Sequence, residues 1–409
     1  MSCGQVRRRT YKRGVRTARA AAQARMDFRF TAEQEAFRQE IRTFLDEELP
    51  ETPEIPEDGW IVGFDKAFSQ KIGAKGWIGL TWPKEEGGQG RSYLDRLILT
   101  EEFLRCGAPV TAHWLGDRQM GPSILHYGTA EQKQKYLPGI MSGESVFCIG
   151  MSEPGAGSDL AGLQTKAEED GDEFVISGQK IWTSFAHVAD YCYLVARSNP
   201  DVPKHKGISE FIVDMKTPGI TVKPIVDITG AHYFNEVFFD QVRVPKSALI
   251  GERDRGWYQI AAQLDYERSG IERLMSNYLV LEAMSDYAKE TGLNRRESVR
   301  QKIAQRYIEF NMGKFLVYKV AWLLSQNIIP NAESAAAKAF CTEYEQRLAQ
   351  TATELLGMHS LLMPGSRQAK LQGRIARAYL YAPSYTIQGG TSTILRTIMT
   401  QRGLGLPPG

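Results

Sequence analysis

The sequence has little of what metal sites, disulfide frameworks and membrane spans require. Its five cysteines and six histidines are scattered over 409 residues, with no CxxC, HxxxH or HExxH spacing. We therefore expect no disulfide scaffold and no metal site, and a reducing compartment is favoured. No apolar run approaches the roughly 20 residues that a membrane-spanning helix needs. The composition, 42% hydrophobic and 24% charged, is typical of globular domains, and the length predicts two or three of them.

Acidic residues are missing from residues 1–25, which contain seven Arg and one Lys. Removing this charge of +8 from the net charge of +2 leaves −6 for residues 26–409, so we expect no nucleic-acid partner. We interpret residues 1–25 as a disordered leader outside the fold. The alternatives are a basic arm, an upstream extension before a start at Met26, and a transit peptide. A transit peptide would place the protein in the mitochondrial matrix, and otherwise a bacterial cytoplasm is expected.

The hydrophobic period changes twice along the chain and predicts an α+β multidomain protein. Residues 26–145 are expected to form an N-terminal α-helical domain, in which Thr31 and Gln34 have the spacing of a capping box. Residues 146–250 contain short β-branched and aromatic runs between turn signals, which favour a middle antiparallel β domain. Residues 251–409 return to long helical patterns, which indicate a C-terminal four-helix bundle. One apolar face of the first helix is formed by Phe30, Phe37, Ile41, Phe44 and Leu45.

A glycine-rich stretch, SEPGAGSDL from Ser152 to Leu160, lies between the helical and the β pattern. Its two glycines, Gly155 and Gly157, would let backbone N–H groups approach a ligand, and its serines supply hydroxyls. Such a turn is suited to binding an anion or a heteroaromatic ring. On local chemistry alone, a simple linker between two domains explains the stretch equally well.

Several longer motifs favour a ligand-binding role for this stretch over a simple linker. SEPGAGSDL is followed by GQKIWTS on a predicted strand, then by NEVFFDQVRVP, and by GGTSTILR at the start of the last helix. In this order, over about residues 26–405, the chain resembles the acyl-CoA dehydrogenase family. The resemblance implies that FAD binds between the β domain and the bundle. It assigns Met151, Ser152, Trp182, Thr183 and Ser184 to the isoalloxazine, Ser158 to flavin and thioester, Gly390 to the substrate, and Thr391 and Thr393 to the adenine end.

The catalytic base departs from the commonest family pattern. Many members have a glutamate just before Gly-Thr-Ser, where this chain has Gly389. A second branch of the family has its glutamate on the first helix of the bundle, and LDYERSG places Glu267 at that position. The resemblance also implies that Asp265 and Arg268 contact the CoA moiety. Without the resemblance, Glu267 would be interpreted as a solvated helix charge, paired with neighbours such as Arg273.

The resemblance implies oxidation of an acyl-CoA to a trans-2-enoyl-CoA, with electrons passing to an electron-transfer flavoprotein. The alternatives are an acyl-CoA oxidase-like enzyme that uses oxygen and a partner subunit of a heteromeric dehydrogenase. Two family motifs that hold FAD across subunits, RxxFG and QxxGGxG, are not intact here, and Arg300 aligns only loosely with the first. The resemblance implies a homodimer or homotetramer, and the two motifs that are not intact make a heteromer the alternative. The acyl pocket is expected to include Trp114, Phe185 and Gln388.

Overall fold

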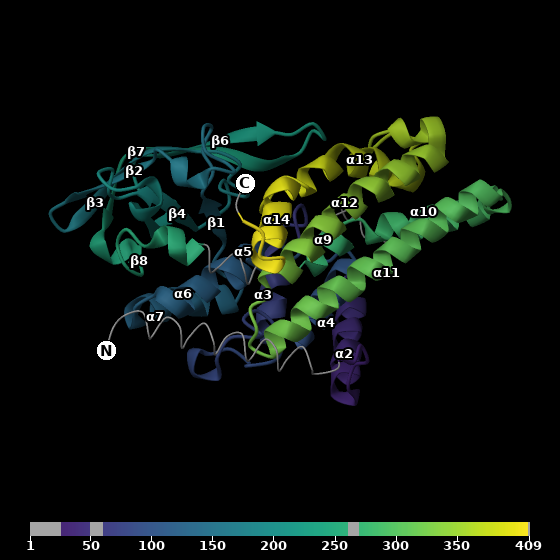
Figure 1. Ribbon diagram of the computed structural model, residues 1–409, viewed down its shortest axis with the longest axis horizontal. Helices are drawn as coiled ribbons and strands as arrows, with labels where there is room; N and C mark the ends of the chain where they lie inside the picture. The colour runs from purple at the N-terminus through teal and green to yellow at the C-terminus, as the bar shows by residue number, and fades with distance from the viewer. Residues whose placement is uncertain (1–25, 50–59, 261–269, 408–409) are drawn as a thin grey trace.

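The computed structural model describes residues 26–49, 60–260 and 270–407. Helices come first along the chain, a β-sheet follows, and a second set of helices completes the fold (Figure 1). The helices before the sheet are α2 (Ala32–Glu48), α3 (Lys66–Ala74), α4 (Tyr93–Arg105), α5 (Thr111–Leu115), α6 (Gly121–Tyr127) and α7 (Ala130–Met141). This order confirms the fold class that the sequence predicted.

Helix α2 begins as its sequence predicts. The Gln34 N–H donates to the Thr31 hydroxyl at 3.2 Å, and the Thr31 N–H donates to the Gln34 side-chain oxygen at 3.0 Å. The capping box therefore satisfies two backbone donors that a helix start leaves unpaired. The expected apolar face is also present, with Phe37, Ile41, Phe44 and Leu45 buried and Phe30 half-buried.

The middle domain contains one sheet, in the order β6-β7-β3-β2-β4-β5-β8, with β1 paired to β4. Its strands are β1 (Phe147–Gly150), β2 (Lys166–Asp170), β3 (Glu173–Lys180), β4 (Tyr191–Arg197), β5 (Ile208–Asp214), β6 (Ile220–Val226), β7 (His232–Pro245) and β8 (Leu249–Ile250). The expected antiparallel sheet needs one correction, because β1 and β2 both pair with β4 in parallel. These two short strands carry no strong alternation, and the glycine-rich stretch connects them.

The predicted strand through GQKIWTS ends earlier than expected. Strand β3 stops at Lys180, so Trp182 and Ser184 lie in the following turn and not on a strand. Trp182 has φ 60° and Phe185 has φ 58°, a left-handed conformation that breaks strand pairing. Backbone bonds to β7 hold the turn, from the Thr183 N–H to the Asn235 carbonyl at 3.0 Å and from Phe185 to Tyr233 at 2.8 Å.

The helices after the sheet are α9 (Ile271–Met275), α10 (Tyr278–Glu290), α11 (Glu297–Ser325), α12 (Asn331–Leu356), α13 (Arg374–Tyr385) and α14 (Ser392–Ile398). The long helices α11 and α12 lie side by side, and α14 packs against α12 beside the β domain (Figure 1). Helix α13 was not predicted from the sequence. It begins after two residues, Leu371 and Gln372, with φ of 52° and 58°, so the local helical pattern is interrupted.

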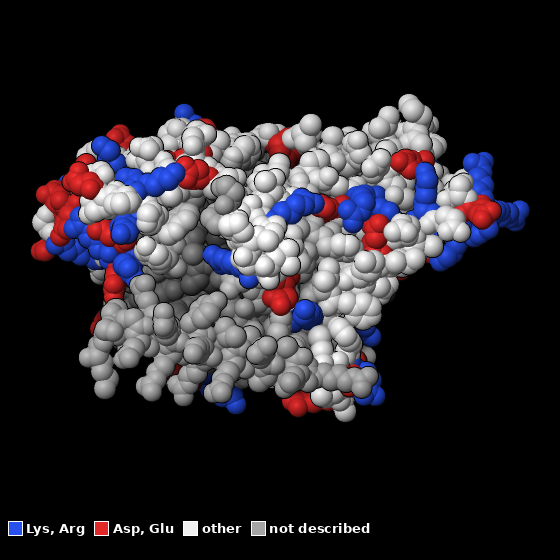
Figure 2. All heavy atoms as spheres, viewed as in Figure 1, with Lys and Arg blue, Asp and Glu red and all other residues white. Residues whose placement is uncertain are grey.

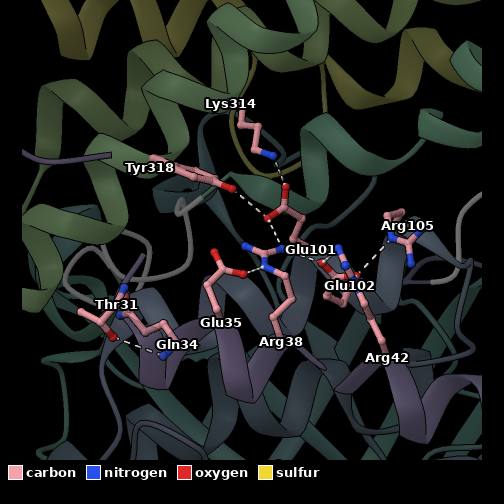
Figure 3. A network of polar contacts seen from close by, with 10 residues as sticks. All are labelled: Thr31, Gln34, Glu35, Arg38, Arg42, Glu101, Glu102, Arg105, Lys314 and Tyr318. Carbon is pink, nitrogen blue, oxygen red and sulfur yellow. Dashed lines mark hydrogen bonds and ion pairs between the residues drawn. The ribbon is translucent and has the colours of Figure 1, made fainter. Parts of the chain in front are cut away.

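A polar network joins the N-terminal helices to the bundle (Figure 3). Glu102 on α4 accepts hydrogen bonds from Arg38 and Arg42 of α2 and from Arg105 of α4, at 2.5 to 3.1 Å. Neighbouring Glu101 accepts from Arg38 at 3.2 Å and from the Tyr318 hydroxyl of α11 at 2.8 Å, and it pairs with Lys314 at 2.6 Å. The two carboxylates thus tie α2, α4 and α11 together.

Three absences hold for the described residues. Their cysteines, Cys106, Cys148, Cys192 and Cys341, are all free thiols. No three His, Cys, Asp or Glu side chains of these residues gather where they could bind a metal ion. None of the described helices combines the length and the apolar character that crossing a membrane requires.

Candidate active site

A buried ion pair holds the start of the glycine-rich loop between β1 and β2. The Lys180 ammonium lies 2.7 Å from a Glu153 carboxylate oxygen and donates to the Met151 carbonyl at 3.1 Å. Glu153 also accepts the backbone N–H groups of Gln164 and Thr165, at 2.6 and 2.9 Å. Its own backbone exchanges hydrogen bonds of 2.9 and 3.0 Å with Ala156. These contacts fix the start of the loop.

The pKa values of both members of this ion pair are lowered, for different reasons. Burial lowers the pKa of Lys180 to about 8, although the Glu153 carboxylate opposes this shift. Burial alone would raise the pKa of Glu153, but the charge and hydrogen bond of Lys180 outweigh it and hold the pKa below its usual value. Sequence analysis missed this pair. A lysine at the last position of strand β3, directly before Ile181 and Trp182, is the signal that could have indicated it.

The outer part of the loop is open. A Cβ atom at Gly155 or at Gly157 would meet no atom within 4 Å, so packing within the chain does not require glycine there. Ser158 is exposed and Ser152 is half-buried, and neither hydroxyl bonds to another described residue. The space beside the loop is therefore free for a ligand that needs close approach to the backbone and hydroxyl partners.

The turn after β3 lies directly beside this loop, because the Ile181 N–H donates to the Ser152 carbonyl at 2.9 Å. Trp182 is 56% exposed and meets Phe234 edge-on at 5.8 Å between ring centroids. A left-handed backbone at a bulky residue costs about 1–3 kcal/mol, and such strain concentrates at functional sites. Thr183 is buried with its hydroxyl unpaired among the described residues, and the Ser184 hydroxyl also has no partner among them.

The bundle contributes the turn before α14. The Lys338 ammonium donates to the carbonyls of Gln388 and Gly390, at 2.6 and 2.5 Å. Gly389 between them has φ 66°, which favours glycine. Thr391 is the N-cap of α14 and accepts the Ile394 N–H at 3.2 Å, which leaves its hydroxyl proton free to donate. Thr393, in the first turn of the helix, is exposed.

Aromatic contacts bring the three parts of the chain together here. Phe64, before α3, stacks on Phe185 of the β domain with 5.6 Å between ring centroids. Trp60 lies 5.6 Å from Trp114 and donates its indole N–H to Ser276 of the bundle at 3.0 Å. The face of the molecule is hollowed between the β domain and α14 (Figure 2). The loop, the Trp182 turn and the turn before α14 thus belong to one region of the fold.

The residues expected from the sequence fall into two groups. Glu267, Asp265 and Arg268 lie outside the described residues. The others are described, and Trp114 and Phe185 are buried among the aromatic contacts. The alternative to Glu267 as base, ordinary surface pairs in this segment, does not hold for Glu272 and Arg273, because they are only 6% and 7% exposed. Arg300 donates to the Asn294 and Arg295 carbonyls just before α11, which is a role within its own chain.

Comparisons with known proteins agree with this fold. Residues 31–144, 148–242 and 254–404 match the N-terminal, middle and C-terminal domains of acyl-CoA dehydrogenases. The chain is 36% identical to acyl-CoA dehydrogenase FadE26 of Mycobacterium tuberculosis, over 93% of this chain and 99% of the relative. It is 28% identical to the mitochondrial long-chain specific acyl-CoA dehydrogenase of Sus scrofa, over 91% and 86%.

Two solved structures of similar proteins are complexes. The Tcur3481-Tcur3483 steroid ACAD superposes with a TM-score of 0.86 at 36% identity, over 94% of this chain and 100% of that one. The ChsE4-ChsE5 complex from Mycobacterium tuberculosis superposes with a TM-score of 0.84 at 35% identity, over 94% and 100%.

The fold is that of a flavin-dependent dehydrogenase, and the chain belongs to the acyl-CoA dehydrogenase family. It is an FAD flavoprotein and an oxidoreductase that acts on acyl-CoA thioesters. The residues present fit FAD. The open loop offers backbone and hydroxyl groups, Trp182 offers an exposed ring, and the Thr183 and Ser184 hydroxyls have no partner among the described residues.

Proposed function

We propose that this protein catalyses α,β-dehydrogenation of an acyl-CoA to the trans-2-enoyl-CoA and passes the electrons to an electron-transfer flavoprotein. The observation that supports this most directly is the open glycine-rich loop beside the exposed Trp182 turn, in a chain of this family. FAD, when bound, supplies the acceptor for the hydride that leaves Cβ. The chain supplies the base, the binding groups and a site from which water is excluded by aromatic side chains.

Glu267 is the proposed base. It takes the proton from Cα, so that the pair of electrons of that C–H bond forms the new double bond as the hydride leaves Cβ. A carboxylate is suited to this step when it is poised near the operating pH. Gly389, with no side chain, leaves room for a base that comes from another element. Asp265, Arg268 and Gly390 are proposed to bind the CoA thioester.

We propose flavin contacts that the described geometry supports. Ser152 and Ser184 have hydroxyls free to bond the isoalloxazine, and the Met151 backbone is held in place through Lys180. Trp182 and Thr183 are proposed to pack against the other side of the ring system. Ser158 on the open part of the loop is proposed to reach both flavin and thioester. Thr391 and Thr393 are proposed to contact the adenine end, where the Thr391 hydroxyl can donate while it caps α14.

The deciding experiment is the anaerobic visible spectrum of the purified holoenzyme mixed with a panel of acyl-CoAs. We expect the flavin band of the wild type to bleach, and we expect Glu267→Gln to keep its flavin but lose bleaching by about 10²-fold or more. Glu290→Gln, an exposed charge on α10, is the matched control and should behave as the wild type. Equal bleaching in Glu267→Gln and the wild type would exclude Glu267 as the base. Rapid hydrogen peroxide release in air would favour the oxidase-like alternative.

An assembly of several chains is also proposed. Ile308, Met312 and Phe315 of α11 are 55%, 50% and 53% exposed, and their spacing places them on one face of the helix. Phe28 meets Phe315 edge-on at 4.9 Å and extends this apolar face. Contiguous exposed apolar groups of this kind mark interaction surfaces. The mass of the purified chain in solution separates a homo-oligomer from a chain that needs a different partner, and Phe315→Glu should lower that mass.

A further inference from the structure

One buried arginine of the bundle has no polar partner. Arg273 on α9 is 7% exposed, and its Nη1 atom is enclosed without a hydrogen-bond partner among the described residues. No hydrogen bond or ion pair joins any of its other donors to a described residue either. It lies over the ring of Trp60, whose centroid is 4.4 Å from the guanidinium carbon. Arginine is almost never buried unless it is paired, because burying an unpaired charge costs several kcal/mol or more.

The guanidinium faces the turn before α14. Its Nη2 atom lies 3.2 Å from the position that a Cβ would take at Gly389. The side-chain amide of Gln388, in the same turn, is also buried with its nitrogen unpaired among the described residues. Lys338 holds this turn through the carbonyls on both sides of Gly389. The unpaired donors therefore lie beside the turn that we assign to the substrate, and not at the outer surface.

The Trp60 ring connects Arg273 to a second indole and to another arginine. Trp60 packs on Trp114, and the Arg118 guanidinium lies 4.6 Å from the Trp114 ring centroid. Arg118 differs from Arg273 because it has an ion-pair partner in Asp117, at 3.0 Å, and donates to the Thr100 hydroxyl at 2.6 Å, although its Nε makes no hydrogen bond among the described residues. Two indole rings beside unpaired N–H donors suit a ligand that has an apolar body and one oxygen acceptor.

We propose that Arg273 binds an oxygen acceptor carried by the acyl group, so that the preferred substrates are acyl-CoAs with a carboxylate or ketone on the chain. This inference rests on the proposed function, because it assigns the acyl group to the space beside Gly389. A site with buried donors discriminates strongly against analogues that lack the acceptor, by up to about 10⁴-fold. Plain hydrocarbon chains would leave Arg273 unpaired and should be poor substrates.

The test compares acyl-CoAs of equal length that differ only in the acceptor. Hexanoyl-CoA, adipoyl-CoA and 5-oxohexanoyl-CoA form one such set, and the eight-carbon analogues form a second. Two quantities are measured, the anaerobic rate of flavin bleaching as kcat/KM and the shift in Tm that saturating acyl-CoA produces. We expect at least one oxygen-bearing chain to exceed its plain counterpart by about 100-fold in the wild type. Comparing adipoyl-CoA with 5-oxohexanoyl-CoA then identifies whether the site binds a carboxylate or a ketone.

Variants test whether Arg273 is responsible for the preference for oxygen-bearing acyl chains. Arg273→Met should reduce the preference at least tenfold, and Arg273→Lys should keep part of it because it retains a charged donor. The matched control is Arg91→Met, since Arg91 also stacks on an aromatic ring, 3.8 Å from the Phe37 centroid, but pairs with Asp95. This control should leave the preference unchanged. The wild-type comparison does not depend on whether any variant folds.

The outcomes separate this inference from the proposed function. If plain and oxygen-bearing chains bleach the flavin equally well in the wild type, the inference is wrong and the proposed function stands. If no acyl-CoA bleaches the flavin, the proposed function fails and the Tm shifts decide. A larger shift with oxygen-bearing chains that is lost in Arg273→Met supports the inference, whereas equal shifts overturn it.

Discussion

Two buried arginines lie where the N-terminal helices meet the bundle, and their surroundings differ. Arg38 is 9% exposed and donates to Glu101 and Glu102, and each of those carboxylates has further partners (Figure 3). Arg273 is 7% exposed and has an indole ring but no carboxylate beside it among the described residues. A complete network stabilises the contact between domains. Donors without partners are what a binding site leaves for its ligand.

The comparison shows why burial alone does not identify a functional residue. Burial lowers the pKa of an arginine, yet the pKa of Arg38 is raised, because Glu101 and Glu102 outweigh the desolvation. The chain itself therefore supplies the carboxylates that compensate the buried charge of Arg38. For Arg273 the compensating group must come from outside the described residues, which makes the unpaired donors, and not the burial, the informative observation.

The largest predicted effect is on stability and comes from disrupting the network around Arg38 and Glu102. Glu102→Gln should lower the free energy of unfolding by about 3 kcal/mol, because it leaves buried Arg38 with a weaker partner and uncouples Arg42 and Arg105. Arg273→Met should change the stability of the ligand-free protein much less, and in the stabilising direction if at all, because it removes an unpaired buried charge. Thermal unfolding of both variants without acyl-CoA checks this contrast. A larger loss in Arg273→Met than in Glu102→Gln would show that the comparison is wrong.

The sequence predicted much of the fold from local signals. The capping box at Thr31, the apolar face of α2 and the β-branched runs of β3 to β7 depend only on neighbours along the chain, and these were confirmed. Strand β1, with four residues, is too short to carry a pattern, and α13 follows two left-handed residues that interrupt its pattern. Trp182 was placed on a strand because nothing in GQKIWTS marks a left-handed turn.

The site was less predictable because it depends on contacts between distant residues. Ser152, Trp182 and Thr391 were identified by resemblance, and their roles stay predictions. Arg273 entered the sequence analysis only as a possible surface partner of Glu267, and the packing of Trp60 against it shows that it is buried. The sequence separation between Trp60, Arg273 and Gly389 leaves no local signal, and a helix pattern alone cannot show which charges lack partners.

A smaller effect on stability is expected when pH changes the charge of Glu102 in its network with Arg38 and Arg42. Although burial would raise it, hydrogen bonds from Arg42 and Arg38 hold the pKa of Glu102 below its usual value of 4.5. The unfolded chain therefore binds more protons than the folded one below about pH 4.5, so the stabilisation by Glu102 is present above that pH and lost as pH falls. The difference in Tm between the wild type and Glu102→Gln should shrink from pH 6 to pH 3. A constant difference would mean that the ionised carboxylate does not carry the stabilisation.

The smallest change in stability, and the sharpest test of the comparison, comes from supplying Arg273 with a partner from the chain itself. A glutamate at Gly389 would begin 3.2 Å from the Arg273 Nη2 atom, so its carboxylate can reach the guanidinium as Glu102 reaches Arg38. The φ of 66° there costs a residue with a Cβ about 1–2 kcal/mol, which the new ion pair should offset in part.

We expect Gly389→Glu to fold with a Tm close to that of the wild type and to lose the extra stabilisation by oxygen-bearing acyl-CoAs. Gly389→Ala introduces the same backbone strain without a carboxylate, and it should lower the Tm while keeping the preference. The measurement is the ligand-induced shift in Tm for adipoyl-CoA against hexanoyl-CoA in the three proteins. If Gly389→Glu kept the preference of the wild type, Arg273 would not be the group that recognises the acceptor, since the new carboxylate would occupy the donors that face Gly389.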